Sequence, residues 1–95
     1  MQQPQTNLRR NAAQNRFEIE ADGQLAGFID YRERDGVLDL VHTQVEPAFE
    51  GQGLASKLAQ FALDEARRSG SKVAPSCSYV ARWMDRHPDY HDLRA

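Results

Sequence analysis

The stretch that decides the fold spans residues 37–70 and reads VLDLVHTQVEPAFEGQGLASKLAQFALDEARRSG. Residues 37–45 predict a strand, which ends before Pro47 because proline cannot donate to a ladder. The apolar residues that follow recur at helical spacing on one face: Leu54, Leu58, Phe61, Ala62 and Ala66. Gly70 is placed to cap this helix at its C-terminus. A strand, a glycine-containing loop and an amphipathic helix therefore follow one another.

Before this stretch the hydrophobic period is two. Apolar side chains alternate with glutamates, which predicts a strand with one solvated face: Phe17, Ile19 and Ala21. Asp22-Gly23 supplies a tight turn, because glycine tolerates the positive φ that such turns require. A second strand is expected over residues 25–32, and Asp35-Gly36 marks the next reversal. Three antiparallel strands are therefore expected before the helix.

Beyond the helix, residues 72–74 predict a short strand that Pro75 closes. Ser76 or Ser78 is placed to cap a second helix with these apolar positions: Tyr79, Val80, Trp83 and Met84. The element order is β-β-β-α-β-α, an α/β fold class with a mixed (α+β) sheet. Since a strand–helix–strand connection is normally a right-handed parallel crossover, the third strand (37–45) and the fourth are expected to be parallel neighbours that splay apart.

Length and composition set the class of protein. The 95 residues suit one domain, and residues 1–14, rich in Gln and Asn without an apolar period, predict a flexible tail before a domain at residues 15–95. The net charge of -2 gives no electrostatic footprint for nucleic acid. The sequence shows no membrane span and no export signal, and it has a single cysteine, so a cytoplasmic location is the default expectation. No metal site is assigned.

Residues 50–57, EGQGLASK, carry the strongest functional signal. Gly51 and Gly53 let the backbone turn sharply, and the first N–H groups of the following helix are left unpaired. With the helix dipole they form an anion site suited to a phosphate. The spacing matches neither the Walker loop nor the dinucleotide fingerprint, so those nucleotide folds are not predicted. Taken alone, the glycines are equally consistent with an ordinary turn.

The strand at 37–45, the Glu46-Pro47 pair and the Gly51-Gln52-Gly53-Leu54-Ala55 run resemble the GNAT superfamily of acetyl-CoA-dependent N-acetyltransferases. The resemblance covers most of the chain after the tail and implies a minimal acetyltransferase domain with acetyl-CoA as cosubstrate. It implies pyrophosphate contacts from backbone groups in the loop: Gln52, Gly53, Leu54, Ala55 and Ser56. It also implies strand-like pairing of pantetheine with the end of the strand: Thr43, Gln44 and Val45. The sequence departs from the family pattern at Glu50, where Arg or Gln is usual.

His42 is a candidate general base, because an unperturbed imidazole titrates near neutral pH and the resemblance places it at the acetyl end of the cosubstrate. The alternative is a strand histidine that a neighbour satisfies. Cys77 precedes the second helix and is a candidate acetyl-accepting nucleophile, or an acid toward the leaving coenzyme A thiolate. The alternative for Cys77 is a small buried apolar residue.

Typical members of the superfamily carry helices between the first two strands and a C-terminal strand pair. Here only Asp22-Gly23 separates those strands, so the acceptor side is expected to be open or completed by a partner. That expectation fits a protein, peptide or small amine as acceptor, and leaves oligomerisation possible. Two alternative functions remain: a coenzyme A-binding or acyl-sensing module with little turnover, and an interaction domain that keeps the fold without the cosubstrate.

Overall fold

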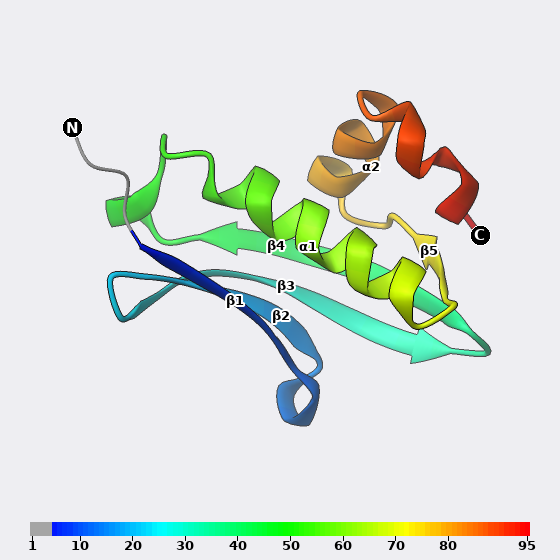
Figure 1. Cartoon of the computed structure of the whole chain (residues 1–95), viewed down its shortest axis with the longest axis horizontal. Helices are drawn as coiled ribbons and strands as arrows, with labels where there is room; N and C mark the ends of the chain where they lie inside the picture. The colour runs from blue at the N-terminus through cyan, green and yellow to red at the C-terminus, as the bar shows by residue number, and fades with distance from the viewer. Residues whose placement is uncertain (1–4) are drawn as a thin grey trace.

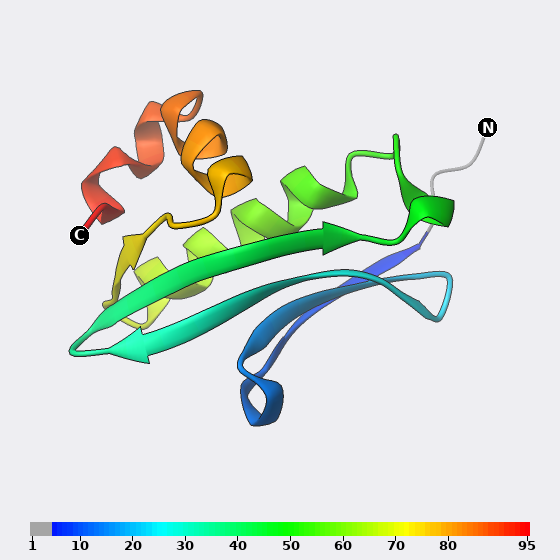
Figure 2. The same cartoon turned by 180° about the vertical axis from the view of Figure 1, so that it is seen from behind.

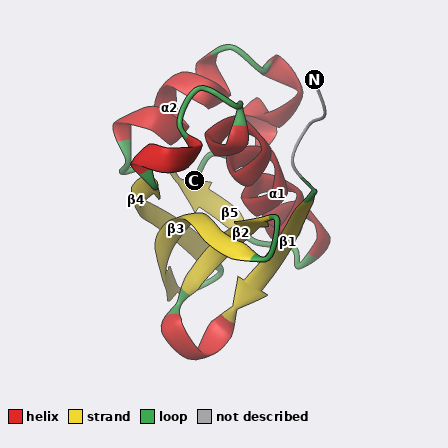
Figure 3. Cartoon of the chain, turned by 90° about the vertical axis from the view of Figure 1, so that its left-hand side faces the viewer, coloured by secondary structure: helices red, strands yellow, loops and turns green. Residues whose placement is uncertain are grey.

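Two α-helices lie against one face of a five-stranded sheet in the computed structural model, which describes residues 5–95 (Figure 1). The strands are β1 (Thr6–Asn11), β2 (Arg16–Ala21), β3 (Gln24–Arg34), β4 (Val37–Val45) and β5 (Lys72–Ala74). The helices are α1 (Leu54–Arg68) and α2 (Ser78–Asp85), with short 3-10 segments at Ala12–Gln14, Pro47–Phe49 and Pro88–Leu93. The strand order is β1-β2-β3-β4-β5, and only the β4–β5 pair is parallel. Figures 2 and 3 show both helices on the same side of the sheet.

The two predicted hairpin turns are confirmed. Asp22 and Gly23 have φ values of 50° and 81°, and Asp35 and Gly36 have values of 52° and 77°. Positive φ at both central residues is what a two-residue loop needs to match the twist of its strands. Each turn therefore fixes the register of its hairpin.

The N-terminal segment differs from the predicted tail. Residues 6–11 form β1, which pairs antiparallel with β2 at the edge of the sheet. On the helix side of β1, the Arg10 guanidinium lies 4.9 Å from the ring centroid of Tyr31 and 5.5 Å from that of Phe17. Arg10 thus occupies a position where an apolar residue is expected in a strand. For this reason the alternation of apolar and polar residues is not visible in this part of the sequence. Residues 1–4 of the predicted tail lie outside the described residues.

The predicted parallel relation between residues 37–45 and 72–74 is confirmed, but because β1 precedes the strands counted from the sequence, the pair is β4–β5. It is short. The register pairs are Val37 with Lys72, Leu38 with Val73 and Asp39 with Ala74. The Cys77 N–H then donates to the Leu40 oxygen (2.8 Å), and the chain turns away into α2. Within the described residues, the edge of β4 beyond Leu40 has no strand partner on this side.

The helix α1 carries the core. Its predicted face is buried except for Phe61, which is half-buried, and Ala59 and Leu63 are buried as well. The buried residues of α1 are Leu54, Leu58, Ala59, Ala62, Leu63 and Ala66. The end is as predicted: Gly70 (φ 74°) donates to the Arg67 oxygen at 3.2 Å, and the next N–H, of Ser71, reaches the Ala66 oxygen at 2.9 Å. This pattern satisfies the last carbonyls of the helix.

The start of α2 corrects a prediction. Its N-cap is Cys77, not Ser76 or Ser78. The Ser76 hydroxyl instead donates to the Asp39 carboxylate of β4. The consequence is that the thiol, rather than a serine hydroxyl, lies at the positive end of the helix.

A bulge in β4 decides which side chains face the helices. Tyr31 pairs with Leu40 and Asp30 with His42, so Val41 has no partner of its own on β3. An extra residue inverts the alternation beyond it. Before the bulge Leu40 points into the core, but after it His42 points to the opposite, helix-free face of the sheet, which we call the open face.

On the open face, charged side chains that pair with one another take the place of a covering helix. The Glu18 side chain is 2% exposed and accepts hydrogen bonds from Arg9 Nε (2.7 Å), Arg16 Nε (2.5 Å) and Asn11 Nδ2 (3.2 Å). Burial raises the pKa of its carboxyl, but these donors outweigh burial and hold the pKa below its usual value. Within the described residues, neither helix has the length and apolar character needed to cross a bilayer.

Candidate functional site

The glycine loop ends at the N-terminus of α1. Gly53 is the N-cap, with φ of 74° and no side-chain cap, and no acidic residue lies in the first turn. Lys57 makes the first helical hydrogen bond, to the Gly53 oxygen (3.3 Å). The N–H groups of the residues between them are therefore free of α-helical partners and available to an anion. A Cβ on Gly53 would meet nothing within 4 Å, so the space over the loop is open.

A hollow of 160 Å³ joins this loop to the end of β4 and the start of α2. Its lining is Val45, Phe49, Glu50, Gly51, Gly53, Leu54, Ala55, Ser56 and Tyr79. We call it the loop hollow. It includes five of the predicted contact residues, while three do not line it: Thr43, Gln44 and Gln52.

The free edge of β4 leads from this hollow into the gap between β4 and β5. The Glu46 N–H donates to the Ala26 oxygen of β3 (2.7 Å). Because backbone groups alternate sides along an antiparallel strand, those of Val45 and Thr43 point away from β3, toward the gap. The backbone groups of Gln44 point to β3. Two of the three residues expected to pair with an extended ligand thus have free backbone groups facing the gap.

Cys77 lies in this gap, opposite the free edge. Its thiol donates to Thr43 Oγ1 (3.3 Å). Burial raises the pKa of the thiol, but the Thr43 side chain and the N–H groups of Val80 and Tyr79 favour the thiolate and bring the pKa below its ordinary value. The sulfur is therefore half-buried at the N-terminus of α2, in surroundings that favour the thiolate. No local pattern in the sequence signals the contact of Thr43 with Cys77, because that contact depends on the bulge in β4.

Replacing Thr43 with valine is expected to raise the pKa of Cys77, because the substitution keeps the shape of the side chain and removes the hydroxyl. The midpoint of the pH dependence of iodoacetamide alkylation should move to higher pH. Cys77 is the single cysteine of the chain, so the alkylation rate reports on it alone. The same substitution at Thr6, on the edge strand β1, is the control and should leave the midpoint in place. A midpoint unchanged by Thr43→Val would contradict the assigned contact.

The structure does not bring His42 and Cys77 to the same face. His42 is exposed on the open face, where its Nε2 lies 3.2 Å from the Gln44 side-chain oxygen and its ring lies 6.1 Å from the ring of Phe28. Thr43 and Cys77 lie on the helix side of β4. The two candidate catalytic residues therefore approach the gap from opposite sides of the sheet.

The family model described as GCN5-related N-acetyl-transferase matches residues 16–93. The chain belongs to this family. The match begins at the first residue of β2 and ends with the last 3-10 segment. Strands β2 to β5, the glycine loop and both helices of this GCN5-related domain therefore fall within it, while β1 precedes it.

Relatives and solved structures agree with the assignment. Protein NATD1 of Gallus gallus is 35% identical over 52 residues, which are 55% of this chain and 47% of that protein. Human NATD1 is also 35% identical over 52 residues, 55% of this chain and 46% of its own length. The chain spans about half the length of the curated relatives it matches.

Two solved GCN5-related structures share the fold. A GCN5-like protein from Staphylococcus aureus superposes with a TM-score of 0.72 at 25% identity, over 100% of this chain and 91% of that one. A GNAT family acetyltransferase from Brucella melitensis, solved in complex with acetyl-CoA, gives a TM-score of 0.58 at 26% identity, over 78% of this chain and 55% of that one. The predicted GNAT-like fold is thereby confirmed.

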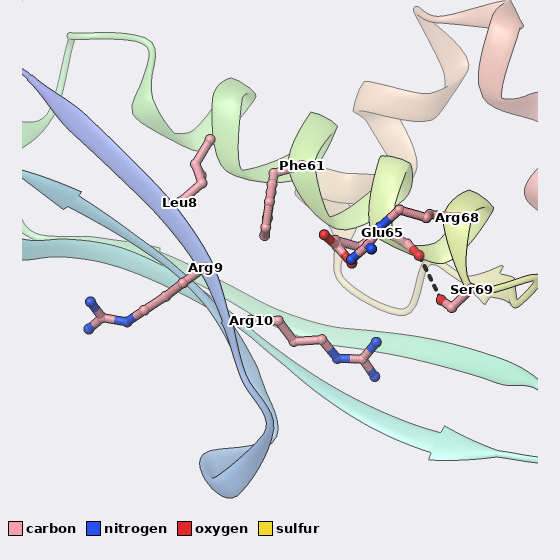
Figure 4. Close-up of a pocket in the computed structure, with 7 residues that line it drawn as sticks. All are labelled: Leu8, Arg9, Arg10, Phe61, Glu65, Arg68 and Ser69. Atoms are coloured by element: carbon pink, nitrogen blue, oxygen red, sulfur yellow. Dashed lines mark hydrogen bonds and ion pairs between the residues drawn. The ribbon is translucent and has the colours of Figure 1, made fainter.

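A larger hollow, of 500 Å³, lies between β1 and α1, away from the glycine loop (Figure 4). Its lining is Leu8, Arg9, Arg10, Phe61, Glu65, Arg68 and Ser69. Its arginines are already neutralised: Arg9 pairs with Glu18 and Glu20, Arg10 with Glu33, and Arg68 with Glu65. The charges here hold β1 in place, and the hollow offers little attraction to a charged ligand.

Proposed function

We propose that this chain transfers the acetyl group of acetyl-CoA to an amine acceptor, by way of an acetyl group held on Cys77. The observation that carries the proposal is the position of the Cys77 thiol, opposite the free edge of β4 in the gap that opens from the glycine loop. A ligand with a pyrophosphate at one end and a thioester at the other could place the first at the glycine loop and the second beside the Cys77 thiol. Membership of an N-acetyltransferase family supports the same assignment.

The residues present suit the cosubstrate. The uncapped first turn of α1 would hold the pyrophosphate through the N–H groups of Leu54, Ala55 and Ser56. The outward backbone groups of Val45 and Thr43 would pair with the amides of pantetheine as a strand does. Glu50, exposed and lining the loop hollow, is the one unfavourable charge there. We expect the backbone cradle, rather than any side chain, to supply most of the phosphate affinity.

The chemistry balances without a further reagent. The Cys77 thiolate attacks the thioester carbon, a bond from Sγ to the acetyl carbon forms, and coenzyme A leaves as a thiolate that takes a proton from solvent. The neutral amine then attacks the acetyl-cysteine, the new N–C bond forms, and Cys77 is released as the thiolate. The amine's surplus proton passes to a base on the acceptor side.

The acceptor side is proposed to be the open face. His42 lies there beside the bulge and is the candidate base for the amine proton. A hollow of 420 Å³, whose lining includes Asp39 and Ala74, also borders the point where β4 and β5 separate. This side has no helix over it, which suits a protein, peptide or small amine better than an enclosed selective site.

A coenzyme A-binding module with little turnover is the second candidate. Two observations favour it: Glu50 faces the loop hollow, and His42 and Cys77 lie on opposite faces of β4. An acetyl-CoA assay of thiol release, run with free amines, polyamines and peptides as acceptors, separates the two functions. Turnover with any acceptor supports the transferase. Calorimetric binding of acetyl-CoA without turnover supports the module, and no binding at millimolar cosubstrate would remove both.

His42→Ala is expected to lower the turnover number by about 100-fold, the usual contribution of a general base, and to leave the Kd for acetyl-CoA unchanged. The reason is that His42 lies on the acceptor side and does not line the loop hollow. His91→Ala, on the exposed C-terminal segment, is the matched control and should keep full activity. Equal turnover numbers for the two variants would remove His42 as the base.

A further inference from the structure

A second hollow continues from the loop hollow along α2. It has a volume of 460 Å³ and is lined by Ser56, Tyr79, Arg82, Trp83, Arg86 and His87. Ser56 and Tyr79 line both hollows, so the two are contiguous. A ligand with a phosphate at the start of α1 therefore has a second polar surface directly beside it.

Arg82 and Arg86 give this surface its charge. Arg82 lies in the last turn of α2 and Arg86 is the C-cap, four residues on, so the two lie on the same side of the helix end, where like charges repel each other. Within residues 5–95 neither forms an ion pair, and both are exposed. Six arginines elsewhere pair with carboxylates: Arg9, Arg10, Arg16, Arg67, Arg68 and Arg94. Two neighbouring arginines without an acid, in one hollow, are a surface that an anion would neutralise.

The wall of this hollow is held in place by contacts of its own. The rings of Trp83 and His87 stack at 3.6 Å with an angle of 11° between them. Trp83 Nε1 donates to Ser56 Oγ (2.8 Å), which fastens α2 to the first turn of α1. The arginines are thus presented from a fixed wall beside the proposed pyrophosphate site.

We propose that Arg82 and Arg86 bind the 3′-phosphate of coenzyme A, and so make the chain selective for the 3′-phosphorylated cosubstrate. This inference rests on the proposed function, because it takes the pyrophosphate to lie at the first turn of α1. The 3′-phosphate and the 5′-diphosphate are carried by the same ribose. When the 5′-diphosphate is at the glycine loop, the 3′-phosphate is therefore close by. The adjoining surface that carries unpaired positive charge is that of Arg82 and Arg86.

The test compares acetyl-CoA with 3′-dephospho-acetyl-CoA by calorimetry at fixed ionic strength. The wild-type chain is expected to bind acetyl-CoA about 10- to 100-fold more tightly, the range for charge-assisted hydrogen bonds to one phosphate. In Arg82→Ala/Arg86→Ala the ratio of the two dissociation constants should fall to about 1. Both side chains are exposed, so the fold should survive, which circular dichroism checks.

The control is Arg34→Ala/Arg68→Ala, which removes two exposed arginines that line neither the loop hollow nor the hollow along α2. It should keep the wild-type ratio, because only charge beside the loop hollow contacts the phosphate. Equal affinity of the wild-type chain for both ligands overturns this inference while leaving the transferase intact. A ratio that persists in Arg82→Ala/Arg86→Ala overturns it as well. No binding of either ligand would instead overturn the proposed function, and this inference with it.

Discussion

Cys77→Ala is expected to lower the rate of acetyl transfer by about 100-fold or more, because the substitution removes the atom proposed to carry the acetyl group. The Kd for acetyl-CoA should change little. Cys77 contributes its sulfur to the gap, but its side chain does not line the loop hollow. The measurement is thiol release under saturating acetyl-CoA and acceptor, with calorimetry for the Kd.

The neighbouring Ser78→Ala variant is the control for changes at the start of α2. Ser78 is the first residue of that helix and is exposed, so full activity is expected. Wild-type activity in Cys77→Ala would refute the covalent route. Loss of activity in Ser78→Ala to the same degree would show that the helix start, and not the thiol, is what the reaction needs.

Gly27→Ala is expected to destabilise the fold by about 1–3 kcal/mol, since overpacking a close contact costs about that much. A Cβ at this position would lie 2.8 Å from the backbone oxygen of Gln44 and 3.2 Å from Val45 Cγ2. A backbone atom cannot rotate away as a side chain can, so β4 must shift. In a chain of this size each kcal/mol lowers the melting temperature by about 4–8 °C.

The same shift would move the strand edge that faces the gap, because Val45 lines the loop hollow. Gly27→Ala is therefore also expected to weaken acetyl-CoA binding. Gly36→Asn is the control: its φ is 77° and nothing lies within 4 Å of a Cβ there, and asparagine tolerates that conformation. A melting temperature for Gly27→Ala within one degree or so of the wild type would contradict the close contact between β3 and β4.

Much of the fold could be predicted from local chemistry. The turns at Asp22-Gly23 and Asp35-Gly36, the apolar face of α1 and its end at Gly70 all depend on neighbours in the sequence, and all are confirmed. The parallel crossover to residues 72–74 followed from a general rule of chain handedness. These elements position the glycine loop at the start of α1, where the phosphate site was expected.

The features that could not be predicted depend on pairing across the chain. The strand β1 was missed because Arg10 covers aromatic rings that a local period cannot reveal. The bulge at Val41 arises between β3 and β4, and it reverses which of His42 and Thr43 faces the helices. Regular alternation from Leu38 and Leu40 would have placed His42 beside Cys77. The contact that Cys77 makes instead, with Thr43, follows from that one extra residue.

The most direct test of the central claim is the intact mass of the chain after mixing with acetyl-CoA in the absence of an acceptor, with rapid acid quenching. We predict a mass increase of one acetyl group, located on Cys77 by peptide mapping, absent in Cys77→Ala and lost on addition of a productive amine. A chain that turns over acetyl-CoA with an amine, yet stays unmodified at every quench time, would contradict the acetyl-cysteine route and leave direct transfer within the same gap.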